Sequence, residues 1–296
     1  MQQAVRKVQA ANLLVFAPHW GSAHLARDVF LQKALDAGFD GVEMSLPLDV
    51  AERTKWTDAI RASGLHLIAQ QWETVLHSDF AEHKRALATY LENAVAARPR
   101  LVNTHTGKDW YSFAQNAELL SLADEVSHRS GVPIVHEIHR SRFSGHPTLL
   151  LPYLDARPDL RLNADLSHWC VGCESLLEDQ THVLQRVFPF VQHIHARVGH
   201  SQGPQVNDFR APEHKDALDA HVGWWDAILA AQQARGETVH TITPEFGPTP
   251  YTQTLPYTNA AVSDAWELNV AMLHFLRDRY TYLHIRHVQT KRNTPC

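Results

Sequence analysis

Cysteine is scarce in this sequence: its 296 residues include only Cys170, Cys173 and Cys296. A low and odd number of thiols argues against a disulfide framework. Cys170 and Cys173 form one CxxC pair, but no second pair is present to complete a four-thiolate zinc site. We therefore expect these thiols to be incidental, with neither a redox nor a zinc-binding role.

Long hydrophobic runs are also missing. No apolar stretch reaches the roughly 18 residues that a membrane-spanning helix needs. The N-terminal segment MQQAVRKVQAANLLVFAPHW places basic residues before a short apolar stretch, which runs into Pro18-His19-Trp20 without a small-residue cleavage site. We expect a cytoplasmic protein with no signal peptide and no membrane partner.

An excess of positive charge is absent as well. The 27 Lys and Arg residues are outnumbered by 32 Asp and Glu residues, which gives a formal net charge of −5. Proteins that bind nucleic acid usually present a positively charged surface to the phosphates. Because this chain has a negative net charge, nucleic acid is not an expected partner. Whether several copies of the chain assemble is left open. The abundant residue is histidine, which occurs 21 times.

The chain has no low-complexity tract and no linker rich in Gly, Pro or Ser. Its length suits one large α/β barrel, typically of about 250 residues, or two ordinary domains. Its hydrophobic content of 44% is enough for a sizeable core. We predict one domain over residues 1–296, with residues 1–11 as an N-terminal arm and residues 286–296 as a flexible tail.

Short apolar segments alternate with amphipathic segments along the whole chain. The apolar segments are rich in β-branched and aliphatic residues and predict eight strands, at 12–17, 41–46, 66–71, 101–106, 134–139, 160–167, 191–197 and 240–246. The amphipathic segments predict helices at 24–38, 54–64, 79–97, 113–131, 146–158, 175–188, 221–236 and 262–280. Gly38 and Gly64 are natural helix ends, and Pro152 interrupts the segment 146–158.

Alternation of strands and helices points to parallel pairing through right-handed crossovers. A doubly wound open sheet would show the same alternation. However, no GxGxxG motif follows the first strand, and eight is the number of strands that closes a barrel. We predict an α/β protein that forms a single-domain (β/α)8 TIM barrel.

Four consecutive strands carry polar residues at their C-terminal ends, where a buried barrel strand should be apolar. In order from the fifth strand to the eighth, these residues are Glu137, Asp165, His195 and Glu245. A single glutamate at the end of a strand is more often part of a loop ion pair than a metal ligand, and each of these residues has such an alternative interpretation on its own. Together they call for one explanation, because burying unpaired carboxylates is costly.

A bound cation provides that explanation, because it neutralises carboxylates, and a barrel gathers the ends of its strands around one mouth. Two glutamates, one aspartate and one histidine form an oxygen-rich ligand set. This set favours one divalent ion, with Mn²⁺ first and Mg²⁺ or Co²⁺ as alternatives, over tetrahedral zinc. Four protein ligands leave coordination positions on the ion free for substrate oxygens. Glu43, near the end of the second strand, is expected to brace the mouth through an arginine.

At these residues the sequence resembles the sugar phosphate isomerase/epimerase superfamily of xylose isomerase-like TIM barrels. The superfamily includes tagatose/psicose 3-epimerases, hydroxypyruvate isomerases and inosose dehydratases. The similarity runs from FDGVEMS to PEFG, and its most specific parts are the Glu/Asp/His/Glu series and the Asp165-x-x-His168 spacing. The resemblance implies that Glu137, Asp165, His195 and Glu245 bind the metal. It also implies that the two glutamates are catalytic and face the two sides of the substrate carbon as proton donor and acceptor.

The resemblance further implies a set of substrate-binding residues, namely His168, Arg197, His105, His139, Arg140 and Arg142. Ketose 3-epimerases place their substrate arginine farther beyond the histidine ligand than Arg197 lies here, which makes Arg210 a rival. Endonuclease IV is a more distant relative that holds three zinc ions with extra histidines. His105 matches one of them, but Gln70-Gln71 and Asp208-Phe209-Arg210 depart from that pattern, so DNA repair is not expected.

The implied function is a divalent-metal-dependent isomerase or epimerase with a small sugar or keto-sugar substrate. One glutamate would remove the proton next to a carbonyl group, and the metal would hold the resulting cis-enediolate. Loss of a β-oxygen substituent instead would make the protein a keto-sugar lyase or dehydratase, for example one that cleaves a 3-keto-glycoside. A sugar-binding protein without turnover is the alternative of a different class.

Two further features are assigned to the mouth of the predicted barrel. The long segment 201–221 after the seventh strand is expected to cap the site. Three tryptophans near other strand ends, Trp20, Trp72 and Trp110, are expected to pack on sugar faces.

Overall fold

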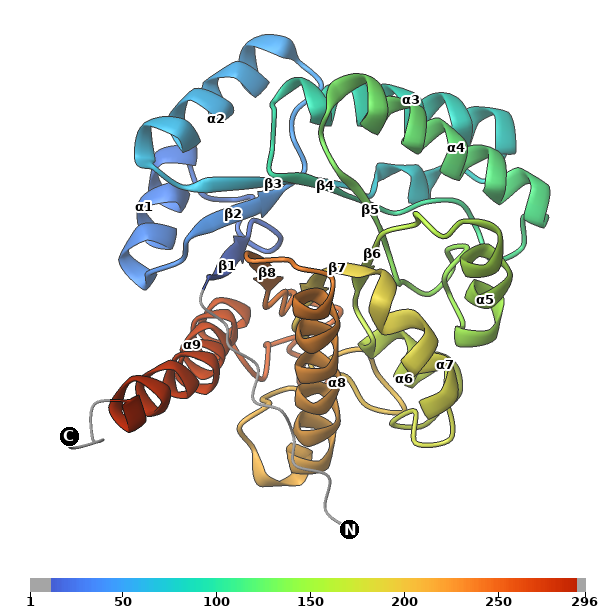
Figure 1. Ribbon diagram of the computed structural model, residues 1–296. Helices are drawn as coiled ribbons and strands as arrows, with labels where there is room; N and C mark the ends of the chain where they lie inside the picture. The colour runs from blue at the N-terminus through green and yellow to red at the C-terminus, as the bar shows by residue number, and fades with distance from the viewer. Residues whose placement is uncertain (1–11, 292–296) are drawn as a thin grey trace.

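The computed structural model describes residues 12–291, with side chains up to residue 280. Its strands form a closed parallel barrel in the order β1 to β8, and β8 pairs back with β1. Figure 1 shows the strands at the centre of the molecule and the helices arranged around them. The predicted single-domain (β/α)8 barrel is confirmed.

All eight predicted strands are present. They are β1 (Leu13–Pro18), β2 (Gly41–Met44), β3 (His66–Gln71), β4 (Leu101–Thr104), β5 (Ile134–Glu137), β6 (Leu162–Ala164), β7 (Val191–His195) and β8 (His240–Thr243). Most of them end earlier than predicted. The residues beyond the observed strand ends include the polar Asp165, Arg197 and Glu245, whereas Glu137 and His195 are the last residues of β5 and β7.

The helices follow the predicted series. They are α1 (Arg27–Ala37), α2 (Val50–Ser63), α3 (Phe80–Ala96), α4 (Phe113–Ser130), α5 (Pro147–Ala156), α6 (Ser167–Cys173), α7 (Thr181–Val187), α8 (Lys215–Ala234) and α9 (Ala265–Lys291). Short 3-10 helices lie at η1 (Glu73–Leu76), η2 (Phe188–Phe190) and η3 (Pro212–His214). Gly38 and Gly64 end α1 and α2 in the left-handed conformation, as predicted.

Several helix bounds differ from the prediction for local reasons. Helix α2 begins at Val50 because the Asp49 side chain accepts a hydrogen bond from the backbone of Glu52 at 2.8 Å. Helix α5 continues through Pro152, whose ring removes only the hydrogen bond to the carbonyl of Thr148, an exposed residue that water can reach.

The segment 175–188 is not one helix. Helix α7 covers only its second half, and α6 forms earlier, directly after β6, where Asp165 accepts a hydrogen bond from the backbone of Ser167 at 3.1 Å. Helix α8 begins at Lys215, and α9 runs to Lys291, through the first residues of the predicted tail. Residues 1–11 and 292–296 lie outside the described part of the chain.

The barrel interior is filled in layers that follow the alternation of side chains along each strand. Phe16, Ile68, Leu101 and Val135 form a small apolar cluster, separate from the large core between strands and helices. Gly41 leaves room for this cluster, because a Cβ atom there would lie 2.5 Å from the Phe16 ring. Residues that are two positions further along the same strands point to the same side. A polar layer that contains Gln70, Asn103 and Glu137 therefore lies above the apolar one.

The large core packs the outer face of the barrel against the helices, with Leu91 of α3 and Trp225 of α8 among its fully enclosed side chains. Within the described part of the chain, no helix combines the length and the apolar character needed to cross a bilayer.

Leu91→Ala should lower the free energy of unfolding by about 2–5 kcal/mol, because it leaves a cavity in a core that cannot close around it. Leu76→Ala is the matched control, since Leu76 is 74% exposed, and it should change this free energy by less than about 0.5 kcal/mol. Urea denaturation followed by circular dichroism measures both. Equal effects of the two substitutions would contradict the layered core.

Candidate metal centre

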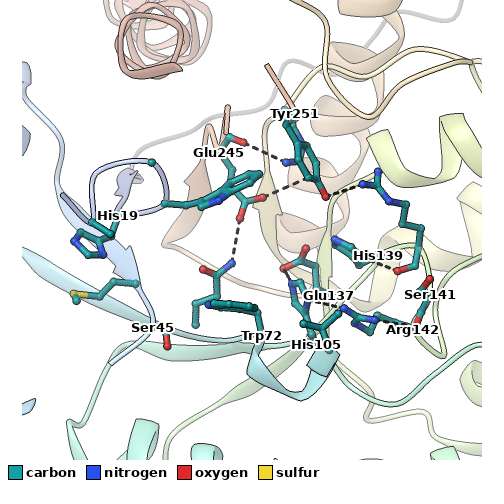
Figure 2. Close-up of a pocket in the computed structure, with 18 residues that line it drawn as sticks. His19, Ser45, Trp72, His105, Glu137, His139, Ser141, Arg142, Glu245 and Tyr251 are labelled. Carbon is teal, nitrogen blue, oxygen red and sulfur yellow. Dashed lines mark hydrogen bonds and ion pairs between the residues drawn. The ribbon is translucent and has the colours of Figure 1, made fainter. Parts of the chain in front are cut away.

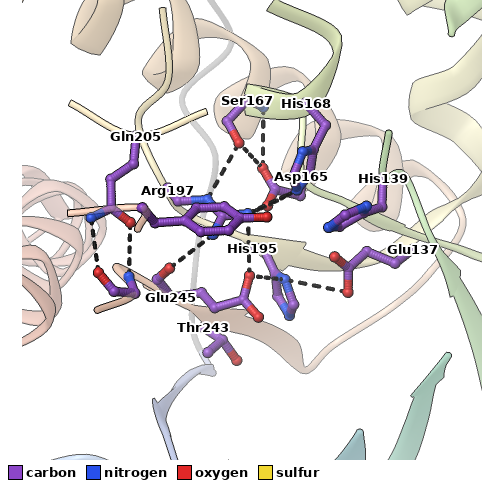
Figure 3. Close-up of polar contacts among 12 residues, drawn as sticks. Glu137, His139, Asp165, Ser167, His168, His195, Arg197, Gln205, Thr243 and Glu245 are labelled. Carbon is purple, nitrogen blue, oxygen red and sulfur yellow. Dashed lines mark hydrogen bonds and ion pairs between the residues drawn. The ribbon is translucent and has the colours of Figure 1, made fainter. Parts of the chain in front are cut away.

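The structure brings the four predicted metal ligands together. Each of Glu137, Asp165, His195 and Glu245 offers one ligand atom, and these four atoms lie within 4.8 Å of one another. The side chains come from the ends of β5, β6, β7 and β8 and are all buried. Figure 3 shows them converging from different strands.

The backbone near Glu245 is held in an uncommon conformation. Glu245 has a φ of 55°, in the left-handed region that residues with a side chain seldom adopt. The next residue, Phe246, is fixed through both of its backbone groups by the side chain of Asn269 in α9. Its N–H donates to Asn269 Oδ1 at 2.7 Å, and its carbonyl accepts from Asn269 Nδ2 at 2.9 Å. Helix α9 thereby helps to hold the turn that aims Glu245 at the other ligands.

His195 lies between carboxylates on both sides. Its Nδ1 is 2.6 Å from Glu245 Oε2 and 3.6 Å from Glu137 Oε2, yet it makes no hydrogen bond because neither contact has the required geometry. Burial works to lower the pKa of His195, but the carboxylates of Glu245, Glu43 and Glu137 outweigh it and raise the pKa well above its usual value. The cluster therefore attracts positive charge strongly.

These observations fit a divalent cation. Ligands on opposite sides of an ion that binds oxygen at about 2.0–2.6 Å lie about 4–5 Å apart, which agrees with the spacing here. The buried Nδ1 of His195 has no hydrogen-bond partner and faces the carboxylates, so it can serve as a ligand atom once a cation displaces its proton. Three carboxylates and one imidazole match Mn²⁺ or Mg²⁺ chemistry better than a thiolate-type zinc site.

Glu137 is held in its ionised form. Burial works to raise its pKa, but His105 and His195 outweigh burial and lower the pKa well below its usual value. Asn103 Nδ2 donates to Glu137 Oε2 at 2.7 Å, and His105 Nε2 lies 3.1 Å from the same oxygen.

Asp165 is paired with Arg197. One guanidinium nitrogen of Arg197 contacts Asp165 Oδ2, and the other oxygen, Oδ1, accepts from the Ser167 backbone. Burial raises the pKa of Asp165 to about 6 with help from the nearby Glu245, and Arg197 works in the opposite direction. Protonation of Asp165 competes with any cation at the site.

Glu43 lies beneath the four ligands and is 2% exposed. Its carboxylate accepts from His195 Nε2 at 3.0 Å and from Asn103 Nδ2 at 3.1 Å, and it also contacts His193 and Thr243. The expected brace through an arginine is wrong, because the partners of Glu43 are two histidines, one amide and one hydroxyl group. Because His195 Nε2 donates a hydrogen bond to Glu43, the Nδ1 atom faces the other three predicted ligands.

Two of the four predicted ligands line a cavity of about 630 Å³ near the C-terminal ends of the strands, whereas Asp165 and His195 are buried and do not line it. Glu137 and Glu245 line this cavity, and the aromatic side chains of Trp20, Trp72 and Tyr251 form parts of its walls. Figure 2 shows the two glutamates reaching into it from different strands.

Most of the residues predicted to bind substrate line the cavity. They are His105, His139, Arg140, Arg142 and Arg197. Residues that the sequence reading did not assign also line it, among them Gln70, whose Nε2 donates to Glu245 Oε1 at 3.1 Å, and Tyr251 in the loop after β8.

His168 has a different position. It is fully buried and is not among the residues that line the cavity in the described chain. Its Nε2 lies 3.0 Å from Arg197 and 3.5 Å from Asp165, and its ring is 3.7 Å from that of His139. Burial, with His139 and the two nearby arginines, lowers the pKa of His168 well below its usual value. In this structure His168 therefore packs against Arg197 and His139, two residues that line the cavity, and helps to fix their positions.

Three expectations for the mouth need correction. Arg210, the rival to Arg197, is exposed and paired with Asp208 away from the cavity. The segment 201–221 does not line the cavity but packs on the loop after β8, where Gln205 hydrogen-bonds both backbone groups of Gly247. Trp110 is 60% exposed and lies outside the cavity.

The CxxC pair lies on α6. Cys170 and Cys173 are both free thiols, and Cys170 is buried. Burial raises the pKa of Cys170 above its usual value, which keeps the thiol protonated and unreactive. Cys296 lies outside the described residues.

Glu43→Gln should weaken Mn²⁺ binding about 10- to 100-fold, because the amide cannot accept hydrogen bonds at both of its ends and no longer orients His195. The matched control is Glu118→Gln on the outside of α4, which should leave Mn²⁺ affinity unchanged. Titration followed by electron paramagnetic resonance measures free Mn²⁺. Unfolding curves of the metal-free variants separate this effect from a loss of folding, and wild-type affinity in a folded Glu43→Gln protein would rule the role out.

No protein-family model matches the chain, and no curated protein matches it. Solved structures do. The probable 3-DHS dehydratase AsbF from Bacillus anthracis is 14% identical with a TM-score of 0.60, over 90% of this chain and 99% of that one. The 3-keto-D-glucoside 4-epimerase YcjR from E. coli is 14% identical with a TM-score of 0.55, over the same shares.

A xylose isomerase-like TIM barrel protein from Mycobacterium smegmatis, solved in complex with magnesium, is 12% identical. The match covers 92% of this chain and 99% of that one, with a TM-score of 0.58. Identities this low show a common fold. The chain has the fold of the xylose isomerase-like TIM barrels.

Proposed function

We propose that the protein is a divalent-metal-dependent sugar isomerase or epimerase that moves a proton on a carbon next to a carbonyl group. One observation carries the proposal: Glu137 and Glu245 line the same cavity from β5 and β8, and their ligand atoms lie within 4.8 Å of each other and of Asp165 and His195. Two carboxylates at one reaction centre can take a proton from one side of a carbon and return it from the other.

Glu137, Asp165, His195 and Glu245 would hold the metal ion, for which Mn²⁺ is the first choice and Mg²⁺ the second. When bound, the ion supplies Lewis-acid polarisation of a substrate carbonyl group. The magnesium complex of the structurally similar Mycobacterium smegmatis protein supports a divalent ion in this fold.

The residues around the two glutamates fit proton transfer. Glu137 is ionised and can accept a proton at a carboxylate oxygen, and Asn103 fixes the orientation of that carboxylate. Gln70 fixes Glu245 in the same way from β3. Held in place by amide donors, neither carboxylate needs to reorganise during proton transfer.

His139 is suited to accept a hydrogen bond from a substrate hydroxyl group. Its Nδ1 donates to the backbone carbonyl of Arg140 at 2.7 Å, so its Nε2 is unprotonated. Burial, with His105, lowers the pKa of His139 well below its usual value and keeps the ring neutral. Trp20, Trp72 and Tyr251 add the flat apolar surfaces on which sugar rings pack.

Elimination from a keto-sugar begins with the same proton removal and is the second candidate. AsbF, a probable dehydratase, and YcjR, an epimerase, have the same fold as this chain, so the fold accommodates either outcome. The two outcomes differ only after the first step, when the carbanion is reprotonated or expels a β-oxygen substituent. A sugar-binding protein would do neither.

Glu245→Gln should slow exchange of the substrate C–H proton with deuterated water at least about 100-fold at saturating Mn²⁺, because the amide cannot take up the proton. The assay is NMR in D₂O with free sugars, sugar phosphates and 3-keto-glycosides, which reports exchange, epimerisation and elimination together. Glu118→Gln is the control. Full exchange activity in a folded Glu245→Gln protein would exclude the two-glutamate mechanism, and a wild-type protein that exchanges none of these compounds would favour binding without turnover.

Removal of divalent metal by a chelator should abolish the same exchange. Addition of Mn²⁺, Mg²⁺ or Co²⁺ should restore it, with the largest recovery for the native metal. The unfolding temperature should also fall on chelation and recover on reloading, because an ion bound only to the folded state stabilises it. Exchange that continues at full rate in the chelated protein would contradict the metal requirement.

A further inference from the structure

The loop between β5 and α5 brings two arginines to one wall of the cavity. Arg140 and Arg142 both line it, and Arg142 is 2% exposed. Figure 2 shows Arg142 beside His105, on the same side of the cavity as His139. A third arginine in the cavity, Arg197, is already paired with Asp165.

Neither loop arginine has a carboxylate partner within 4.0 Å in the described chain. Arg142 Nη1 donates to the carbonyl of Ser141 at 2.9 Å, its Nη2 lies 3.4 Å from His105 Nδ1, and its Nε is buried without any partner. Arg140 Nη2 donates to the Tyr251 hydroxyl at 3.1 Å. Arg140 Nη1 also lies 3.4 Å from His168 Nδ1. Both guanidinium groups are therefore held in position by groups other than carboxylates.

Enclosing a guanidinium group without an anion is costly. The acidic group that most affects Arg142 is Glu137, whose carboxylate already accepts from Asn103 and faces His105 and His195. In the proposed function its charge is also committed to the metal ion. An anion from outside the chain would remove the cost, and the planar fork of donors on a guanidinium group matches the oxygens of a carboxylate or phosphate.

A second cation at this wall is the competing explanation, because His105, Glu137 and His139 also offer ligand atoms within 4.8 Å of one another. The hydrogen bonds oppose it. Arg142 donates to His105 Nδ1, which occupies that lone pair, and His105 Nε2 faces Glu137 at 3.1 Å. Two guanidinium charges on the same loop would repel a further cation, whereas they attract an anion.

We propose that the substrate carries an oxyanion, either a carboxylate or a phosphate group, which Arg142 and Arg140 bind while the reacting carbon lies between Glu137 and Glu245. The location of the reacting carbon rests on the proposed function, but the oxyanion site itself does not. The two parts are close together, since His105 contacts Arg142 at 3.4 Å and Glu137 at 3.1 Å. The substrate class is thus an acidic sugar or a sugar phosphate.

Binding of simple anions tests the site without turnover. Inorganic phosphate and D-gluconate serve as probes, with D-glucitol as the neutral counterpart of gluconate, and isothermal titration calorimetry of the Mn²⁺-loaded protein gives the affinities. At least one anion should bind, D-glucitol should bind more weakly, and affinity should fall as the salt concentration rises. The preferred anion distinguishes a phosphate from a carboxylate substrate. Equal binding of gluconate and glucitol, with no binding of phosphate, would overturn the proposal.

Arg142→Met should weaken binding of the preferred anion about 10- to 100-fold, because it removes charge-assisted hydrogen bonds. The matched control is Arg129→Met on the outside of α4, which should leave binding unchanged. If Arg142→Met does not fold, Arg140→Met and Arg142→Lys are measured instead. Arg142→Lys keeps the charge but loses the fork, so it should retain part of the affinity. Unchanged anion affinity in the folded variants would overturn the assignment.

Glu245→Gln separates this proposal from the proposed function. It should lose C–H exchange but still bind the preferred anion, because the ion pairs of Glu245 are with His195 and Arg197 and not with the loop arginines. If anions bind through Arg142 and no acidic compound exchanges, the oxyanion site stands and the isomerase proposal fails. The opposite outcome is that neutral and acidic keto-sugars exchange their C–H protons at the same rate, in the wild-type protein and in Arg142→Met. In that case the isomerase proposal stands and the oxyanion site fails.

Discussion

Four carboxylates are buried side by side at one end of the barrel, where water cannot solvate them; they belong to Glu43, Glu137, Asp165 and Glu245. Their mutual repulsion and desolvation must be offset within the protein or by a bound ion. His195 touches three of the four and lies between Glu43 on one side and Glu137 and Glu245 on the other. Arg197 pairs with the remaining one, Asp165. The other residues at the mouth of the barrel depend on the positions of His195 and Arg197.

The barrel positions this cluster through strand register. Side chains that point inward recur at every second residue, so the apolar Leu101 and Val135 lie directly below the polar Asn103 and Glu137. Asn103 donates to both Glu43 and Glu137 and therefore links the supporting layer to the ligands. The groups that would perform chemistry thus stand at the ends of paired strands or within two residues of them. The arginines of the proposed oxyanion site stand on a loop, where another substrate preference can evolve without disturbing the proposed metal ligands.

Much of this arrangement could be predicted from the sequence, because its signals are local. Eight apolar runs identified the strands, and the carboxylates of Glu137, Asp165 and Glu245 departed from the apolar pattern at one end of each run. The partners of Glu43 could not be predicted, because its contact with His195 crosses the barrel between residues 152 positions apart. Tyr251 enters the cavity from a loop with no periodic pattern. Segment 201–221 was misplaced because a loop's length and prolines do not determine which face of the mouth it covers.

The loop arginines and the carboxylates give the cavity two neighbouring regions of opposite charge. Arg142 approaches the Glu137 carboxylate only through His105, so the two charges do not cancel as those of Arg197 and Asp165 do. Removing a proton from a carbon builds negative charge on the substrate, and an oxyanion already present nearby would oppose that step. Guanidinium groups that neutralise the oxyanion lower this penalty before the reaction begins. A fixed cationic wall beside a proton-transfer centre is therefore what an acidic substrate requires, and a neutral sugar would leave the buried guanidinium group of Arg142 without an anion.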